Sequence, residues 1–275
     1  MRRWGVGAAA VAIALLASGC SAKEALSLNA PEGATEQAPT IESLWFGAWV
    51  AMAVVGVLTG GLILFAAIRF RRREGDPAPK QVRYNVPLEV MYTVVPLVLI
   101  MGMFFFTVRD QTVLTKVSDN PDNTVGVVGF RWSWAFNYVE DDVYDVGTAE
   151  PDDTPTLYLP VDESVVFELQ SPDVIHSFWI PAFLMKMDVF PDRLNKFEVT
   201  PNKVGTYAGR CAELCGVDHA RMLFTVKVVE RAEYDRHIAE LAAKGQVGSI
   251  ETDRISRDGE RYWESDRYAE PEGTL

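Results

Sequence analysis

Residues 209–222 read GRCAELCGVDHARM, and the interpretation of the whole chain depends on this stretch. It contains two of the three cysteines and one of the three histidines of the protein. Short runs rich in β-branched and aromatic residues flank it, at 205–211 and 222–229, so the stretch is predicted to connect two β-strands. Four kinds of site use such residues: a disulfide, a zinc site, a redox dithiol and a soft-metal site.

The residue types separate these four alternatives. A disulfide between Cys211 and Cys215 suits an oxidising compartment, but it leaves His219 and Met222 without a role. A thioether is a poor zinc ligand, and dithiol oxidoreductases usually carry C-x-x-C in βαβ surroundings rather than β surroundings. Thiolate, imidazole and thioether together are the ligand set of a copper electron-transfer site.

Two thiolates allow either a mononuclear or a dinuclear copper site. One cysteine and two histidines suffice for a single copper, whereas two bridging sulfurs can be shared by two coppers that each need an imidazole. His219 supplies one imidazole, and His176 in SPDVIHSFWIP (171–181) is the candidate for the other. The third histidine, His237, lies in a predicted helix, and surface polarity is the interpretation given to it.

The region around this stretch is predicted to be a β-domain. Turn residues separate the runs, and regular short strands of this kind indicate a sandwich or barrel of roughly 100 residues. A helix is predicted at 232–244, followed by a polar tail at 245–275. The predicted strands are 124–138, 156–160, 164–171, 195–201, 205–211 and 222–229.

Two long apolar runs precede the β-domain. Residues 41–68 and 90–108 are nearly free of charge, and each approaches or exceeds the roughly 20 residues of a membrane helix. The connection 69–85 has six basic and two acidic residues, so the positive-inside rule places it in the cytoplasm. The chain from 109 onward is therefore expected outside the cytoplasm.

The N-terminus has the pattern of an export signal. Arg2 and Arg3 precede an apolar run at 6–17 that is too short to span a membrane. The following LLASGC resembles the lipobox of bacterial lipoproteins, which predicts lipidation of Cys20; a plain signal peptide is the alternative. Residues 21–40 are small and polar and are expected to form a linker.

The protein is acidic, with a net charge of −12. This balance argues against nucleic acid as a partner, because phosphate binding needs clustered Lys and Arg. Residues 109–275 hold 31 acidic and 17 basic residues, so the acidity belongs to the outer part. The tract EDDVYDVGTAEPDD (140–153) is interpreted as a solvated loop or as a surface that steers a basic partner.

DVIHSFWIPAFLMKMDVFPDRLN (173–195) followed by GTYAGRCAELCGVDHARM (205–222) resembles cytochrome c oxidase subunit II. In that family C-x-E-x-C-x-x-x-H-x-x-M and an upstream H-S-F/W build the dinuclear copper centre called CuA. The resemblance covers roughly 41–230 and implies a cupredoxin-like sandwich. It implies bridging by Cys211 and Cys215, and further ligation by His176, His219, Met222 and the backbone carbonyl of Glu213.

The resemblance implies three further roles. The Glu213 side chain matches a ligand of a magnesium ion shared with subunit I. GFRWSWAFNY (129–138) resembles the family's G-x-Q-W-x-W stretch, with Arg131 in place of the more usual glutamine, and Trp132 matches the tryptophan of electron entry. Glu89 in PLEVMYTVVP matches a glutamate at the mouth of a proton channel, and exposure to water at a helix end is the alternative.

The predicted architecture is a two-helix transmembrane hairpin, an extracytoplasmic all-β cupredoxin-like sandwich, and a short C-terminal helix with a tail. The lipoprotein-type signal peptide is expected at 1–19 and the linker at 20–40. The hairpin is expected at 41–109, with helices at about 41–69 and 87–108. The CuA domain is expected at 110–230, and the C-terminal helix and extension at 231–275.

The resemblance implies a function in respiration. It indicates subunit II of a bacterial aa3-type, proton-translocating cytochrome c oxidase, with subunits I and III as partners and haem only in the partner subunit. The electron donor is expected to be a soluble or membrane-bound cytochrome c, with a bc complex as a candidate supercomplex partner. A membrane-anchored copper chaperone is the alternative function, and a copper-free quinol oxidase subunit is disfavoured because every copper ligand is retained.

Overall fold

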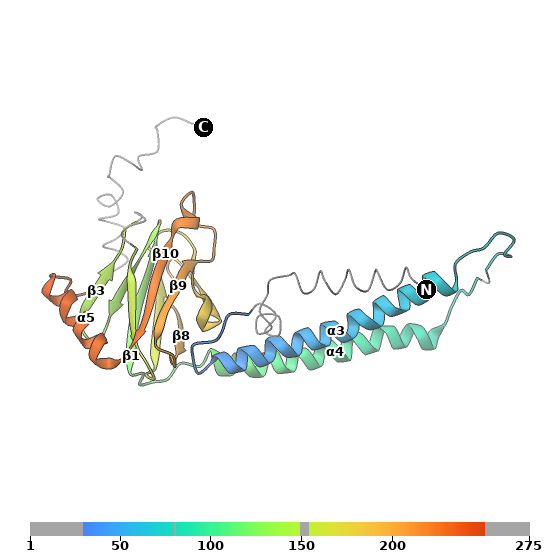
Figure 1. Cartoon of the computed structure of the whole chain (residues 1–275), viewed down its shortest axis with the longest axis horizontal. Coiled ribbons are helices and arrows are strands. Elements are labelled where there is room, and N and C mark those ends of the chain that lie inside the picture. Colours follow the sequence, from blue (N-terminus) through green and yellow to red (C-terminus); the bar gives the residue numbers. More distant parts are fainter. Residues whose placement is uncertain (1–29, 80, 149–153, 251–275) are drawn as a thin grey trace, which may run out of the picture. The chain divides into compact units, whose positions relative to one another are not determined.

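A computed structural model describes residues 30–79, 81–148 and 154–250 of the chain (Figure 1). The predicted signal peptide 1–19, Cys20, the first part of the linker and the tail from 251 lie outside the described residues.

Two long helices begin the described chain. Helix α3 (Ala38–Arg69) and helix α4 (Val86–Leu114) lie side by side (Figure 1) and are long and apolar enough to cross a membrane. Their large apolar side chains are exposed along most of both helices, which suits a lipid environment rather than a protein core. Both helices extend beyond the expected ranges, since α3 starts three residues earlier and α4 ends at Leu114 rather than at 108.

The cap of α4 explains where this helix begins. The Asn85 side chain accepts a hydrogen bond from the Leu88 amide, and Glu89 Oε1 accepts one from the Asn85 amide at 3.0 Å. Two amides that have no partner within the helix are thereby satisfied, as in a capping box. Pro87 in the first turn does not interfere, because its missing amide would be unpaired there anyway.

The β-domain is a sandwich of two five-stranded sheets, with strand orders β3-β2-β1-β5-β8 and β4-β10-β9-β6-β7. Its strands alternate inward and outward residues, as a sheet with one buried face requires. The strands are β1 (Asn123–Phe130), β2 (Ser133–Tyr138), β3 (Val143–Val146), β4 (Thr156–Pro160), β5 (Val165–Gln170), β6 (His176–Ile180), β7 (Met185–Val189), β8 (Asn195–Val199), β9 (Gly205–Cys211) and β10 (Leu223–Val229).

Aromatic side chains fill the space between the two sheets. Phe178 of β6 and Phe224 of β10 stack with ring centroids 4.8 Å apart, and Trp134 of β2 packs edge-on against both. All three are at most 2% exposed. Gly209 in β9 makes this packing possible, because a Cβ atom there would lie 2.1 Å from the Phe224 ring.

Several strand predictions were incomplete. The single run expected at 124–138 is two strands, β1 and β2, that are joined through Arg131 and Trp132. The acidic tract at 140–153 was interpreted as a loop, but its described part includes strand β3. Strands β6 and β7 were not predicted, because their short polar–apolar runs lie among residues that resemble turns.

Helix α5 (Arg231–Ala243) follows β10 close to the predicted range. The interpretation of His237 as a surface residue was wrong. Its ring stacks on Tyr158 with a centroid separation of 3.7 Å, and burial lowers its pKa. His237 therefore packs the helix onto β4.

Candidate metal centre

Strand pairing brings the two halves of the candidate site together. His176 is the first residue of β6, and Cys211 is the last residue of β9. These strands are antiparallel neighbours, with Phe178 opposite Cys211, so both side chains reach the same end of the sandwich. The loop from 212 to 222 then returns the chain to β10, and it supplies the remaining candidates.

The candidate ligand atoms cluster closely. The Sγ atoms of Cys211 and Cys215 are 3.8 Å apart, and both cysteines are free. Cys211 Sγ lies 4.0 Å from His176 Nδ1, and Cys215 Sγ lies 3.6 Å from His219 Nδ1. Met222 Sδ is 3.7 Å from Cys215 Sγ, and Cys211 Sγ is 3.2 Å from the Glu213 carbonyl oxygen.

These distances fit metal ions. With metal–sulfur bonds of about 2.3 Å and metal–nitrogen bonds of about 2.0 Å, two ligands of one ion can be no more than about 4.3–4.6 Å apart. Each measured pair lies within this limit. His176, Cys211 and Cys215 offer ligand atoms that all lie within 4.8 Å of one another. The soft sulfur and imidazole donors favour copper, and each thiol has its own imidazole.

Asp173 orients the His176 ring. Its Oδ1 lies 2.8 Å from His176 Nε2, so the ring donates its Nε2 proton there and its Nδ1 lone pair faces the cysteines. The same carboxylate accepts hydrogen bonds from the Arg131 and Val174 amides. Burial alone would raise the pKa of Asp173, but these hydrogen bonds lower it overall.

The electrostatics of the site favour one thiolate. A hydrogen bond from Cys215 is the largest cause that lowers the pKa of Cys211, and His176 and the Glu213 backbone act in the same direction. The same contact raises the pKa of Cys215, since a second negative charge beside the first is unfavourable. Burial lowers the pKa of His176, but hydrogen bonds with Asp173 and Cys211 outweigh it and raise the pKa. Binding a cation would remove the conflict between the two thiols.

The two tryptophans of the β1–β2 region differ in position. Trp134 is fully buried between the sheets, whereas Trp132 is half-buried at the turn beside the metal-centre loop. A Cβ atom on Gly216 would lie 2.8 Å from Trp132 Nε1, so the ring packs directly on the loop backbone. Gly216 also has a φ of +136°, which only glycine adopts easily. Trp132 thus contacts the loop that carries Cys215 and His219.

The remaining predicted roles concern Glu213, Glu89 and Cys20. Glu213 has an exposed side chain in the loop, while its carbonyl faces Cys211. Glu89 lies in the first turn of α4 and caps that helix. Asp218 and Arg221 of the same loop as Glu213 pair with each other at 3.3 Å. Cys20 lies outside the described residues.

Sequence reasoning missed the role of Asp173. The spacing Asp-x-x-His in SPDVIHSF was a usable signal, because metal-binding imidazoles commonly donate their second N–H to a carboxylate. The link from this carboxylate to the Arg131 amide, 42 residues away in sequence, has no sequence signal.

The fold and the site define a cupredoxin-like metalloprotein domain that follows two helices able to cross a membrane. A family model described as "Cytochrome C oxidase subunit II, periplasmic domain" matches residues 123–229. A probable cytochrome c oxidase subunit 2 of Streptomyces avermitilis is 47% identical, over 85% of this chain and 85% of the relative. The chain therefore belongs to the cytochrome c oxidase subunit II family, whose members are subunits of an oxidoreductase complex.

Two further curated relatives have related names. A probable cytochrome c oxidase subunit 2 of Streptomyces coelicolor is 46% identical over 85% of each chain. The cytochrome c oxidase subunit 2 of Mycobacterium tuberculosis is 30% identical over 86% of this chain and 81% of the relative. One similar solved structure is the periplasmic domain of subunit II of cytochrome oxidase of Bradyrhizobium japonicum. It is 30% identical in sequence, with a TM-score of 0.44. The match covers 46% of this chain and 99% of that domain.

Proposed function

We propose that the protein is subunit II of a bacterial aa3-type cytochrome c oxidase. In this role it accepts electrons from cytochrome c at a dinuclear CuA centre and passes them to haem in subunit I, where oxygen is reduced to water with proton pumping. One observation carries the proposal: two free thiols lie 3.8 Å apart, and each has its own imidazole.

The residues of the centre have distinct roles in this proposal. Cys211, Cys215, His176 and His219 would hold the two copper ions, with one imidazole beside each thiol. Met222 Sδ and the Glu213 carbonyl would complete the ligand set, since they lie beside Cys215 and Cys211. Copper held this way supplies a one-electron carrier whose charge is shared by two ions. Strand β6 begins at His176 and strand β9 ends at Cys211, so the sheet keeps both side chains fixed, which limits rearrangement when the electron arrives.

We assign electron entry to Trp132. Its ring contacts Gly216 in the ligand loop and is half-exposed, so it can touch both a donor at the surface and the site. Trp134 is enclosed by Phe178 and Phe224 and is fully buried, which suits a packing role.

The outer contacts of the subunit follow from the same proposal. The exposed Glu213 side chain is placed to share a magnesium ion with subunit I. Glu89, at the N-terminus of α4, is assigned to the mouth of a proton channel. Subunits I and III and a soluble or membrane-bound cytochrome c are the expected partners, and a supercomplex with a bc complex is compatible with this donor.

The proposed location is the bacterial cell membrane, with two spanning helices and the copper domain on the extracytoplasmic side. Arg69, Arg71, Arg72 and Arg73 end α3 or follow it, and all are exposed. Basic residues of this kind favour the cytoplasmic side. Lipidation of Cys20 would add an anchor at the mature N-terminus.

Electron paramagnetic resonance of the full-length chain, purified in detergent and loaded with copper, tests the proposal. A hyperfine pattern split by two equivalent copper nuclei is the expected result. A single-copper pattern would contradict it. Tight Cu(I) binding without a mixed-valence signal would instead favour the copper chaperone.

A further inference from the structure

Arg131 brings a positive charge to the carboxylate that supports the candidate metal centre. Its Nε atom lies 3.5 Å from Asp173 Oδ2, and its backbone amide donates to the same oxygen at 2.8 Å. The other carboxylate oxygen, Asp173 Oδ1, lies 2.8 Å from His176 Nε2. One carboxylate therefore joins a guanidinium group on one side to a candidate copper ligand on the other.

The two oxygens of Asp173 serve different partners. Besides facing the imidazole, Oδ1 accepts hydrogen bonds from the Val174 amide at 2.6 Å and from the Ser171 hydroxyl at 3.1 Å. Oδ2 accepts the Arg131 amide and lies within ion-pair distance of the Arg131 side chain. The backbone hydrogen bond persists with any side chain at position 131. A substitution there can therefore remove the charge while Asp173 stays in place.

The ion pair itself contributes little to the stability of the fold. The Arg131 side chain is 49% exposed, and ordering a long exposed side chain costs entropy that offsets most of the attraction. Asp173 is only 16% exposed and His176 is fully buried, so the charge acts on them with weaker screening than between surface groups. The main effect of Arg131 is therefore electrostatic and falls on the imidazole.

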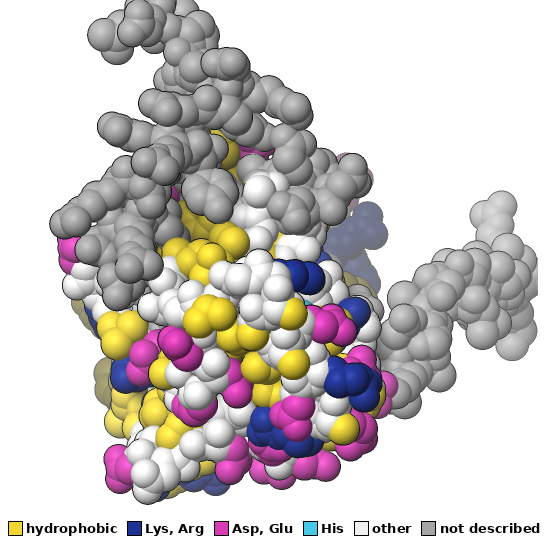
Figure 2. Space-filling model, turned by 90° about the vertical axis from the view of Figure 1, so that its left-hand side faces the viewer, with side chains coloured by type: hydrophobic (Ala, Val, Ile, Leu, Met, Phe, Trp, Pro, Cys, Tyr) yellow, Lys and Arg dark blue, Asp and Glu magenta, His cyan; other side chains and the backbone are white. Residues whose placement is uncertain are grey.

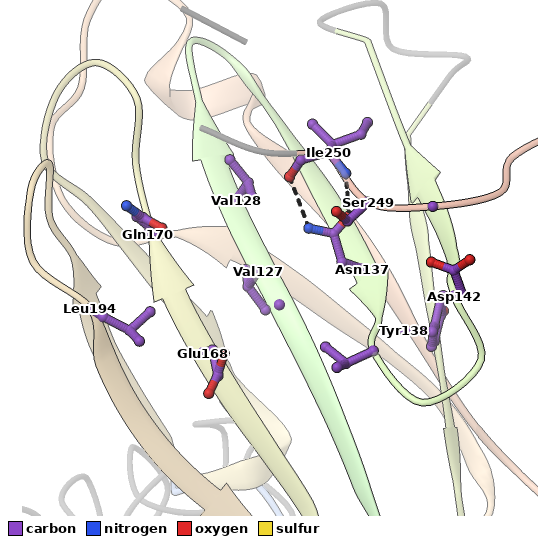
Figure 3. A pocket seen from close by; sticks show the side chains of 13 residues that line it. Val127, Val128, Asn137, Tyr138, Asp142, Glu168, Gln170, Leu194, Ser249 and Ile250 are labelled. Carbon is purple, nitrogen blue, oxygen red and sulfur yellow. Dashed lines mark hydrogen bonds between the residues drawn. The ribbon is translucent and has the colours of Figure 1, made fainter. Parts of the chain in front are cut away.

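The turn that carries Arg131 is held in place from the face of β1 opposite to the sandwich core. Phe130, the residue before Arg131, belongs to a buried cluster on that face, and Ile250 packs against this cluster. The Asn137 side chain fixes Ile250 with two hydrogen bonds of 2.9 Å, one to its carbonyl and one from its N–H (Figure 3). The fold thus positions the backbone of the turn independently of the ion pair.

We propose that Arg131 raises the reduction potential of the copper centre by acting through Asp173 and His176. A carboxylate behind a metal-binding imidazole makes the ring a stronger donor, which stabilises oxidised copper. The charge of Arg131 offsets part of the carboxylate charge, so the ring donates less and the reduced state is favoured. In the reaction concerned, one electron leaves the donor, which is oxidised, and enters the copper centre, which is reduced.

This inference rests on the proposed function, because it concerns the same site. It assigns to Arg131 a role that glutamine, the more usual residue at this place in the family, cannot take. Glutamine would preserve the backbone hydrogen bond to Asp173 but would bring no charge. Arg131→Gln therefore isolates the electrostatic contribution.

A redox titration of the copper-loaded, full-length chain in detergent, followed by electron paramagnetic resonance, tests the proposal. Small mediators carry the electrons, so binding of the natural donor does not enter. Arg131→Gln should lower the midpoint potential, with a fall of about threefold or more in the equilibrium constant for reduction, as expected for one lost charge near the site. Arg131→Lys retains the charge and should keep most of the wild-type value.

The matched control is Arg236→Gln, which removes an equal charge from an exposed position of α5 and should leave the potential unchanged. The hyperfine pattern and the Tm should stay close to those of the wild type in all three variants, since every candidate ligand is retained. An unchanged potential in Arg131→Gln would overturn the proposal, as would an equal fall in Arg131→Lys or Arg236→Gln. A fall that accompanies a lower Tm and an altered hyperfine pattern would indicate a structural role and would overturn it as well.

The same samples separate this proposal from the proposed function. His176 is a candidate ligand in both a dinuclear and a single-copper site, so the fall in potential is expected for either. A single-copper pattern in the wild type contradicts the proposed function alone, whereas an unshifted potential in Arg131→Gln contradicts the role of Arg131 alone. A site that holds copper only as Cu(I) would contradict both.

Discussion

At the residue scale, the metal centre depends on a carboxylate that does not face the ligand cluster. Asp173 holds the His176 ring through Nε2 and also accepts the Arg131 amide at 2.8 Å. One side chain therefore connects a proposed ligand to the turn that carries Trp132. Substitutions at Asp173 can therefore disturb both the candidate metal centre and the proposed electron entry at Trp132 without removing a candidate ligand.

Asp173→Asn should weaken copper binding. An asparagine can accept from His176 or from the Arg131 amide, but it cannot serve all the donors that the carboxylate serves, because half of its amide group donates. Loss of such a supporting contact typically costs about 10- to 100-fold in metal affinity. Competition with a chelator would measure it. Asp235→Asn on the exposed face of α5 is the control, and equal affinities in both variants would contradict the prediction.

Trp132→Phe should slow oxidation of the electron donor while it leaves the copper spectrum unchanged. The Trp132 ring contacts the ligand loop at Gly216 but is not itself a candidate ligand. We therefore expect the rate of electron entry to fall while copper binding stays unchanged. We expect a loss of about tenfold or more, equivalent to at least ~1.4 kcal/mol in activation free energy. Stopped-flow kinetics would measure it.

The matched control for Trp132 is Trp179→Phe. Trp179 is also half-buried, but it lies on the outer face of the other sheet beneath Arg210. A similar slowing in both variants would indicate a general effect of removing tryptophan rather than a route through Trp132.

At the scale of the elements, the close approach of β9 and β10 controls the geometry of the loop that they enclose. Cys211 ends β9 and Leu223 begins β10, and the Cys211 amide donates to the Met222 carbonyl at 3.0 Å. The spacing of the two strands therefore determines where the loop begins and ends.

Gly209→Val should destabilise the sandwich. Its Cβ would lie 2.1 Å from the buried Phe224 ring, so the ring or the strand must move. Overpacking of this kind typically costs about 1–3 kcal/mol. Thermal unfolding would show a lower Tm. Ala208→Val, at the exposed neighbouring position on β9, should have almost no effect, and equal Tm values for the two variants would refute the argument.

Glu89→Gln separates the two roles of Glu89 in helix α4. Glutamine retains an oxygen that can accept from the Asn85 amide, so the helix cap is preserved while the ionisable group is lost. If Glu89 admits protons to subunit I, turnover and proton uptake in vesicles should fall several-fold at normal expression. Unchanged proton uptake would leave only the capping role.

At the scale of the whole molecule, the net acidity lies in residues 109–275, which hold 31 acidic and 17 basic residues. On the face shown in Figure 2, Asp and Glu side chains are interspersed with Lys and Arg. Ion pairs account for part of this mixing, among them Lys196 with Glu168 and Arg231 with Glu163. The net charge of −12 still gives the protein a negative field at a distance.

The rate of association with a basic donor should fall as salt is added. The Debye length shortens from about 30 Å at 0.01 M to about 8 Å at 0.15 M, so distant acidic residues stop contributing. Stopped-flow mixing over this range should show the second-order rate decrease while the rate of the internal electron transfer stays constant. A second-order association rate that does not change with salt would exclude electrostatic steering of the donor by the outer domain.

Local patterns in the sequence predicted the parts of this protein that depend on neighbouring residues. Long uncharged runs predicted α3 and α4, because a membrane helix satisfies its own backbone. The spacing of Cys211, Cys215, His219 and Met222 indicated the site, because these residues share one short loop. Alternating β-branched residues predicted most strands of the sandwich.

Only the tertiary structure decided the features that join distant segments. The pairing of β6 with β9 brings His176 to Cys211, and strand β6 was not recognisable from its own residues. Asp173 reaches the Arg131 amide, and Asn137 binds Ile250 across 113 residues. Such contacts depend on sheet order and register, which arise from packing of the whole core, and no local pattern encodes them.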